Sequence, residues 1–281
     1  MKVDAHHHLW NLDQVAYPWL DPMFGPICRT FEADELEPLL RSAGIDRTVL
    51  VQSMNSYEDT EYMLQAAEEK PWIGAVVGWV PLNLPEVADR KLQHYTKNPV
   101  FKGVRHLIHE ERDPDWIIRD SVIEGLKRLA SYGLALDVVA VFPHHLGHIP
   151  YLAERVPGLR MVIDHLAKPP APGHELHKEW SKQLAAAAQY PQVYAKISGL
   201  NTATGKHDWC ADDLAPWIDE AMARFGADRL MFGSDWPVAN LAGDYHRVWT
   251  ETNKAIAAYS LAEQAQLLGG TAIRFYQMEA L

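Results

Sequence analysis

Cysteine is scarce in this sequence, since Cys28 and Cys210 are the only two among 281 residues. Two cysteines are too few to build a disulfide framework. Without a Cys-x-x-Cys spacing they do not indicate a metal site held by thiolates either. We therefore expect two reduced thiols in a cytoplasmic protein.

Long apolar runs and basic residues are also scarce. No stretch approaches the ~20 apolar residues of a membrane-spanning helix, so we expect no membrane segment. No basic and apolar leader precedes the first predicted strand, so we expect no secretory signal. Lys and Arg number 26 against 37 Asp and Glu, a net charge of −11. Nucleic acids and anionic membranes both bind basic faces. The charge balance argues against both partners and leaves small molecules open.

No low-complexity run or Gly/Ser linker divides the chain, so we predict a single domain over 1–281. Apolar, strand-like runs alternate with helix-like segments eight times, about 35 residues per repeat, which favours an α/β fold of the (β/α)8 TIM-barrel type over an open sheet. The predicted strands are 2–8, 47–52, 73–80, 101–107, 135–141, 160–165, 193–198 and 229–235. The predicted helices are 34–42, 58–69, 85–95, 115–131, 145–155, 175–189, 211–225 and 244–258, with Asp34 and Asp59 as candidate N-caps.

Three further segments stand outside this alternation. Residues 11–32 and 167–174 follow strand ends and are predicted to be loops at the rim where barrel sites lie. The first is rich in aromatic residues, and it is either a wall or lid of the site or simply packs on the barrel. Residues 260–281 are predicted to form a helical extension beneath or beside the barrel.

The segment KVDAHHHLW, residues 2–10, pairs a short strand with a His-x-His motif. Side chains alternate along a strand, so His6 and His8 should share one face while His7 points the other way. Two such imidazoles can share a cation or hold one carbonyl oxygen. Asp235 ends the last predicted strand, beside Trp236, which suggests a closed barrel with its site at one rim. The alternatives are a purification-tag remnant or a surface histidine cluster without chemistry.

Polar residues stand at the carboxyl ends of most predicted strands, which converge on one mouth in a parallel barrel. They are His6, His8, Gln52, Arg105, His106, Asp137, Asp164, His165, Lys196, Ser198 and Asp235. Alternation favours Arg105 inward over His106, although Arg105 could simply pair with Asp137, and we favour His165 over Asp164 for the site. The loop histidines are expected to be merely solvated; they are His109, His144, His145, His148, His174 and His177.

The chain resembles the amidohydrolase superfamily in four motifs, DAHHHLW, KGVRH, VIDHLAKP and FGSDWP. Within the superfamily it is most similar to the amidohydrolase-2 branch, which includes sugar lactonases of the L-fuconolactonase and L-rhamnonolactonase type. The resemblance spans essentially the whole chain. It implies catalytic roles for His6, His8, His165 and Asp235, and it places Arg105 where relatives hold substrate oxygens.

One departure from the family pattern concerns the metal. Strand four offers Arg105 instead of a bridging lysine or glutamate, and strand five offers Asp137 instead of a histidine, so a binuclear centre is not expected. A single divalent ion such as zinc on His6, His8 and Asp235 is compatible with the pattern. Some lactonases of the branch work without metal, so activity need not depend on it.

The resemblance implies a hydrolase that opens an aldonolactone such as L-fucono-1,5-lactone. Asp235 would activate the water, and the histidines, directly or through zinc, would stabilise the oxyanion. Arg105, Gln52, Trp236 and Lys196 are the predicted substrate-binding residues. The alternatives are a metal-dependent decarboxylase, a dicarboxylate or muconolactone hydrolase, and a metal-binding protein without catalysis.

Overall fold

Eight parallel strands form one sheet in chain order in the computed structural model, which describes residues 1–279. The strands are β1 (Val3–His7), β2 (Arg47–Val51), β3 (Ile73–Gly78), β4 (Phe101–His106), β5 (Ala135–Val138), β6 (Arg160–Ile163), β7 (Val193–Ile197) and β8 (Leu230–Phe232). The sheet closes where β1 meets the segment after β8. His7 and Trp236 form a parallel bridge, and the amide of His8 donates to the carbonyl of Trp236 at 2.7 Å. The predicted single-domain (β/α)8 barrel is confirmed.

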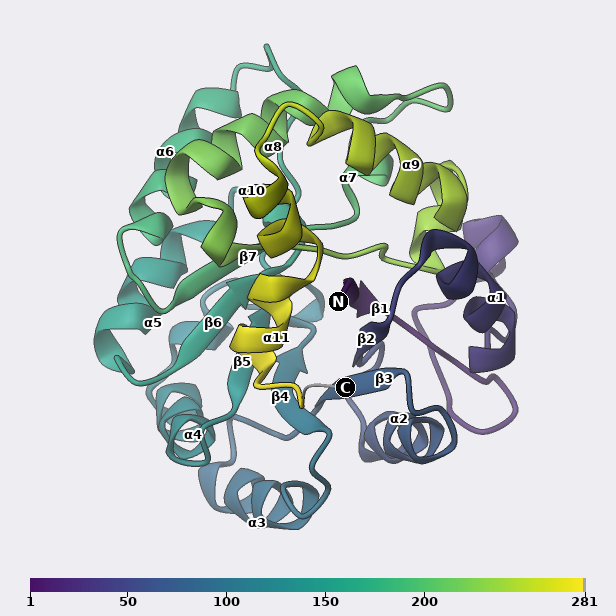
Figure 1. Ribbon diagram of the computed structural model, residues 1–281. Helices are drawn as coiled ribbons and strands as arrows, with labels where there is room; N and C mark the ends of the chain where they lie inside the picture. The colour runs from purple at the N-terminus through teal and green to yellow at the C-terminus, as the bar shows by residue number, and fades with distance from the viewer. Residues whose placement is uncertain (280–281) are drawn as a thin grey trace.

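Helices surround the sheet (Figure 1). They are α1 (Ala33–Ala43), α2 (Tyr57–Glu69), α3 (Pro85–Tyr95), α4 (Asp120–Ser131), α5 (Ile149–Arg155), α6 (His177–Ala188), α7 (Leu200–Ala203), α8 (Ala211–Phe225) and α9 (Tyr245–Ala255). The 3-10 helices are η1 (Pro22–Ile27), η2 (Ile108–Glu110), η3 (Trp116–Ile118), η4 (Leu146–His148), η5 (Asp164–Ala167), η6 (Ala227–Arg229) and η7 (Val238–Ala242). The helices form because their apolar residues recur every three or four positions. In α4, for example, Val122, Leu126 and Leu129 are buried against the barrel.

Several predicted boundaries differ from the observed ones. The predicted strands 73–80, 135–141 and 229–235 extend past the ends of β3, β5 and β8. Burial continues beyond the last ladder bond, since Val80, Val139 and Ala140 are all buried, so the apolar run did not mark the strand end. The predicted helices 115–131 and 145–155 each start with a separate 3-10 turn, η3 or η4. Between η3 and α4, Arg119 is extended, with ψ 143.

The two predicted helix caps were also wrong. The cap of α2 is Ser56, whose hydroxyl accepts from the amide of Asp59. The Asp59 carboxylate instead accepts from Tyr17 Oη at 2.8 Å and from the amide of Ser53 at 2.9 Å. Helix α1 begins at Ala33 after Glu32, so Asp34 lies in its first turn. There its charge favours the positive end of the helix dipole.

The amino end of the barrel is closed by the C-terminal helices, which cross it in Figure 1 beside both chain termini. They are α10 (Leu261–Ala265), a π-helical turn η8 (Gln266–Gly270) and α11 (Thr271–Tyr276). Phe275 and Tyr276 pack with Val3 and Ala5 inside the barrel. A Cβ at Gly269 would lie 2.2 Å from the carbonyl oxygen of Met1, so only glycine permits this close approach. Residues 280 and 281 of the predicted extension lie outside the described residues.

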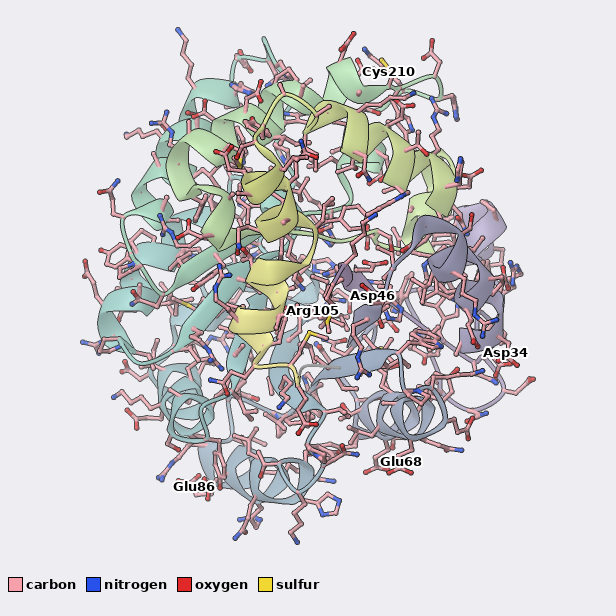
Figure 2. All side chains as sticks on the ribbon, viewed as in Figure 1. Asp34, Asp46, Glu68, Glu86, Arg105 and Cys210 are labelled. Atoms are coloured by element: carbon pink, nitrogen blue, oxygen red, sulfur yellow. The ribbon has the colours of Figure 1, made fainter. Side chains whose placement is uncertain are left out.

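Figure 2 shows Asp34, Glu68 and Glu86 at the periphery of the molecule, whereas Arg105 is buried in the interior. Within residues 1–279, no helix is both long and apolar enough to cross a membrane.

Candidate active site

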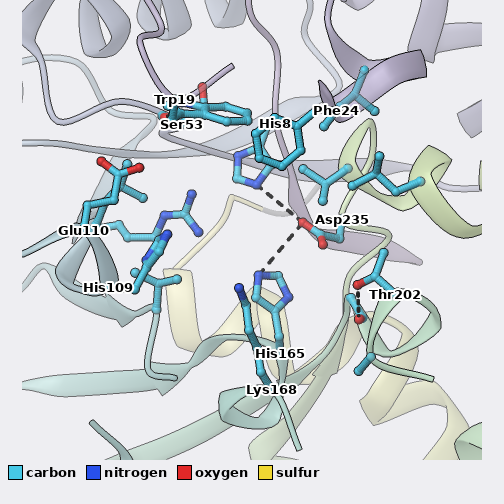
Figure 3. A pocket seen from close by; sticks show the side chains of 18 of the residues that line it. His8, Trp19, Phe24, Ser53, His109, Glu110, His165, Lys168, Thr202 and Asp235 are labelled. Carbon is cyan, nitrogen blue, oxygen red and sulfur yellow. Dashed lines mark hydrogen bonds and ion pairs between the residues drawn. The ribbon is translucent and has the colours of Figure 1, made fainter. Parts of the chain in front are cut away.

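A cavity of about 560 Å³ opens at the carboxyl ends of the strands, where the sites of such barrels lie. Its polar lining residues are His8, Ser53, Arg105, His109, Glu110, His165, Lys168, Thr202 and Asp235. Its apolar lining residues include Trp10, Trp19, Phe24, Ile27, Leu107, Val139, Val238 and Leu241. Figure 3 shows Trp19 and Phe24 on one side of Asp235 and His165 and Lys168 on the other. The cavity thus has a polar floor and an aromatic wall.

His6, His8, His165 and Asp235 come together, as the sequence predicted. His8, His165 and Asp235 line the cavity, and His6 is fully buried beside them. The Nε2 atoms of His6 and His8 lie 3.2 Å apart. Asp235 Oδ1 lies 3.7 Å from His6 Nε2, 3.5 Å from His8 Nε2 and 3.9 Å from His165 Nε2. His7 points away and contacts Thr48 Oγ1 at 2.8 Å, which is the expected alternation along β1.

The backbone around Asp235 holds its side chain in place. Asp235 has a positive φ of 59°, and its amide donates to the carbonyl of His6 at 2.8 Å. Gly199, also at positive φ, lies against the site, because a Cβ there would be 2.8 Å from His165 Nδ1 and 2.9 Å from Asp235 Oδ2. Non-glycine residues at positive φ are costly and cluster at functional sites. The sequence alone does not reveal this constraint.

The end of β6 departs from the predicted alternation. Four consecutive residues, 165–168, adopt positive φ values between 48° and 61°. Alternation applies only within a strand, and β6 already ends at Ile163. Asp164 and His165 therefore both reach the interior, so choosing only His165 was too narrow. Asp164 contacts Arg105 Nη1 at 3.2 Å and Lys196 Nζ at 3.1 Å.

The four predicted substrate-binding residues lie at different depths. Arg105 lines the cavity, and it pairs with Asp164, not with Asp137. Gln52 is buried and donates to the carbonyl of Arg105 at 3.1 Å. Trp236 is buried against Phe31. Lys196 is fully buried below His6. Of these four residues, Arg105 lines the cavity, whereas Gln52, Trp236 and Lys196 do not.

Sequence reasoning missed several residues of the cavity wall. His109, expected to be merely solvated, lines the mouth together with Glu110, and Lys168 enters from the turn after β6. Trp19 and Phe24 were not singled out, but they belong to the loop 11–32, one prediction for which was a wall or lid of the site. Both line the cavity, and Trp19 Nε1 donates to the carbonyl of Ser53 at 2.8 Å. The available signal was their position in loops that follow strand ends.

Burial governs the protonation of the site. It lowers the pKa of His6 well below its ordinary value, lowers the pKa of His8 to about 3, and lowers that of His165. These imidazoles are therefore neutral near pH 7. Burial raises the pKa of Asp235, which makes its carboxylate a better proton acceptor than an exposed aspartate. Burial alone would also raise the pKa of Asp164, but the charge of Lys196 holds it well below its ordinary value.

The donor atoms fit a single zinc ion. Nitrogen ligands at 2.0–2.1 Å from zinc lie about 3.3 Å apart in a tetrahedral shell. The separations within the group of His6, His8 and Asp235 range from 3.2 to 3.7 Å. A second group with suitable spacing, His6, Asp164 and His165, shares His6 with the first. The geometry suits one ion in either place.

A barrel that presents two histidines from its first strand and an aspartate after its last has the architecture of an amidohydrolase-type enzyme. A family model described as amidohydrolase, Amidohydro_2, matches residues 3–278. The chain belongs to this family, as the sequence motifs indicated.

Two named relatives match nearly the full chain. An L-fucono-1,5-lactonase of Burkholderia ambifaria is 36% identical over 287 residues, covering 99% of this chain and 96% of the relative. An L-fucono-1,5-lactonase of Burkholderia multivorans is 31% identical over 291 residues, with the same coverage. The crystal structure of an amidohydrolase from Burkholderia multivorans with bound zinc superposes with a TM-score of 0.91 at 29% identity, covering 99% of this chain and 100% of that one.

Proposed function

We propose that this protein is a lactonase that hydrolyses a sugar lactone of the L-fucono-1,5-lactone type. The observation that carries the proposal is the cavity itself, which exposes Asp235 and His165 beside Arg105 at its base and offers an aromatic wall above them. Two relatives that match 99% of the chain carry the name L-fucono-1,5-lactonase, which supports the same substrate class. A cavity of about 560 Å³ is ample for one sugar ring.

The chemistry needs a general base, stabilisation of the oxyanion and a proton for the leaving oxygen. In the proposed mechanism Asp235 takes a proton from water, whose oxygen attacks the lactone carbonyl. Arg105 and His165 stabilise the developing oxyanion. The bond from carbon to ring oxygen then breaks, and Asp235 returns its proton to that oxygen to give the open hydroxy acid. The net reaction adds one water.

A metal ion would add to this machinery without replacing it. His6, His8 and Asp235 would hold zinc, with His165 or substrate beside them. When bound there, zinc supplies Lewis-acid polarisation of the lactone carbonyl. The zinc in the Burkholderia multivorans amidohydrolase supports this assignment.

The aromatic wall is proposed to bind the face and the methyl group of a deoxy sugar. Trp19→Ala should raise KM about tenfold with little change in kcat, because the ring contributes about 1.5 kcal/mol of contact, equivalent to a factor of about ten. Steady-state kinetics test this. Met23→Ala is the matched control, since Met23 lies in the same loop but is 84% exposed and outside the cavity. A large fall in kcat for Trp19→Ala would instead place Trp19 in the chemical step.

The pH profile should show the protonation of the base. Activity requires ionised Asp235, whose pKa burial raises, so kcat/KM should fall with decreasing pH through an inflection above the ordinary carboxyl value of 3.8. The histidines are neutral, so their ionisation should cause no further change in kcat/KM near pH 6.5. Initial rates in buffers of constant ionic strength measure this, and tryptophan fluorescence at each pH verifies folding. A flat profile down to pH 3.8 would contradict the assignment.

A lactone panel tests the proposal as a whole. Purified protein, before and after chelation, is assayed with neutral aldonolactones and dicarboxylate-substituted lactones by means of a pH indicator. Fast opening of a deoxy-sugar lactone supports the proposal, and failure to open any lactone rejects it. Preference for a dicarboxylate lactone would favour the alternative function. That alternative has some support because Lys168 joins Arg105 at the cavity and could hold a carboxylate.

The cellular setting is also a proposal. Cys28 and Cys210 form no disulfide with one another, since both are free. Free thiols are typical of the reducing cytoplasm, and we assign the enzyme there.

A further inference from the structure

Lys196 is a fully buried lysine that the proposed mechanism does not use. Lysines are almost never fully buried unless they are paired. Its Nζ lies 3.0 Å from His6 Nδ1 and 3.1 Å from Asp164 Oδ1, and it also donates to Asp137. The ammonium group thus lies directly behind a histidine that belongs to the candidate metal group.

The direction of these hydrogen bonds fixes where His6 carries its proton. An ammonium group can only donate, so Nδ1 of His6 must accept and carries no proton. Neutral His6 is then protonated on Nε2. Asp164 Oδ1 lies 3.3 Å from the same Nδ1, farther than the Lys196 donor.

His8 has the opposite arrangement. Its Nδ1 lies 2.7 Å from the carbonyl of Val51, which can only accept, so Nδ1 carries the proton and Nε2 has a free lone pair. The 3.2 Å contact between the two Nε2 atoms is then a hydrogen bond from His6 to His8. The contacts of His6 with Lys196, of His8 with Val51 and of His6 with His8 are all compatible with this one assignment of protons. Metal-binding histidines usually donate their other ring nitrogen to a carboxylate or carbonyl. His8 meets this condition and His6 does not.

The lysine is held in place from the closed end of the barrel. Asp137 Oδ2, which accepts from Lys196, also accepts from the Tyr276 hydroxyl at 2.7 Å. Tyr276 belongs to α11, the helix that closes the amino end. A continuous set of buried contacts therefore runs from the C-terminal helix to His6.

We propose that Lys196 is a positioning residue that holds His6 in the Nε2-protonated form and thereby weakens zinc binding at His6, His8 and Asp235. A metal ion at His6 Nε2 needs the lone pair there, which moves the proton to Nδ1. At Nδ1 the proton would face the donors of Lys196 at 3.0 Å. Binding must therefore break the hydrogen bond from Lys196 to His6 Nδ1. The proposal concerns the same site as the proposed lactonase function but requires no turnover for its test.

Zinc affinity of the chelated full-length protein, measured by competition with a chromophoric chelator, tests this directly. Lys196→Met should bind zinc at least tenfold more tightly than the wild-type chain. Lys168→Met is the matched control, because Lys168 is a cation at the cavity that does not contact His6. It should change zinc affinity by less than threefold. Equal effects of the two substitutions, or no tightening in Lys196→Met, would overturn the proposal.

A second measurement needs no variant at position 196, which matters if Lys196→Met fails to fold. Ring ¹⁵N shifts of histidine-labelled, metal-free wild-type protein distinguish protonated from bare nitrogens, and His6→Asn assigns the His6 signals. We expect His6 protonated on Nε2 and His8 protonated on Nδ1. A proton on His6 Nδ1 would overturn the proposal. Tyr276→Phe, which removes one hydroxyl from the anchor, should shift the His6 ring signals toward a mixture of the two forms.

Discussion

The Asp235→Asn variant is expected to fold normally and to hydrolyse lactones about 10³-fold more slowly than the wild-type chain. The amide is nearly isosteric with the carboxylate but cannot take a proton from water. The backbone bond from Asp235 to His6 is unaffected by the exchange. The measurement is kcat/KM with the preferred lactone at neutral pH, with circular dichroism and thermal unfolding as tests of the fold.

Two comparisons separate the base from other roles of this carboxylate. Glu110→Gln removes another carboxylate that lines the same cavity and should lose less than about threefold, since Glu110 lies outside the histidine group. Both variants and the wild-type chain are also assayed after chelation. A wild-type chain that stays active while Asp235→Asn is inactive identifies a base, not merely a metal ligand. Retention of a tenth of the activity by Asp235→Asn would refute the assignment.

The barrel could be predicted from the sequence because its signal is local and repeated. Each strand is a short apolar run, and each outer helix carries an apolar stripe, as α4 shows. The meeting of the candidate residues at the ends of β1 and β8 could also be predicted, because alternation along a strand places His6 and His8 on one face. Parallel strands then bring the acid that follows the last strand to the same rim.

Other features depend on information that the sequence pattern does not hold. The left-handed turn at 165–168 brings both Asp164 and His165 inward, and no glycine marks it. The sequence also does not show how deep a strand-end side chain lies along the barrel axis. Lys196 and Arg105 therefore look equivalent in the sequence, although Arg105 reaches the cavity and Lys196 does not. His109 was misjudged because loop conformation, not period, brings it to the mouth.

Substitution of Arg105 is expected to have the second largest effect on turnover. Its guanidinium donates to Asp164 and to the carbonyl of Gln52, which fixes its plane beside the cavity. Its Nε is buried and has no partner among residues 1–279. Arg105 also lines the cavity, where its guanidinium can donate to a substrate oxygen. Arg105→Met should therefore lower kcat/KM by about 10²- to 10³-fold, the usual effect of removing an oxyanion donor.

Arg105→Lys distinguishes positioned donors from positive charge alone. Lysine keeps the charge near Asp164, which protects the fold, but it lacks the planar fork of donors. We expect Arg105→Lys to be as stable as the wild-type chain in thermal unfolding and still at least tenfold slower. Lys168→Met, which removes a cation from the same cavity, should cost only a few-fold. If Arg105→Lys had full activity, the site would need only a cation here, and the oxyanion would have to be stabilised by His165.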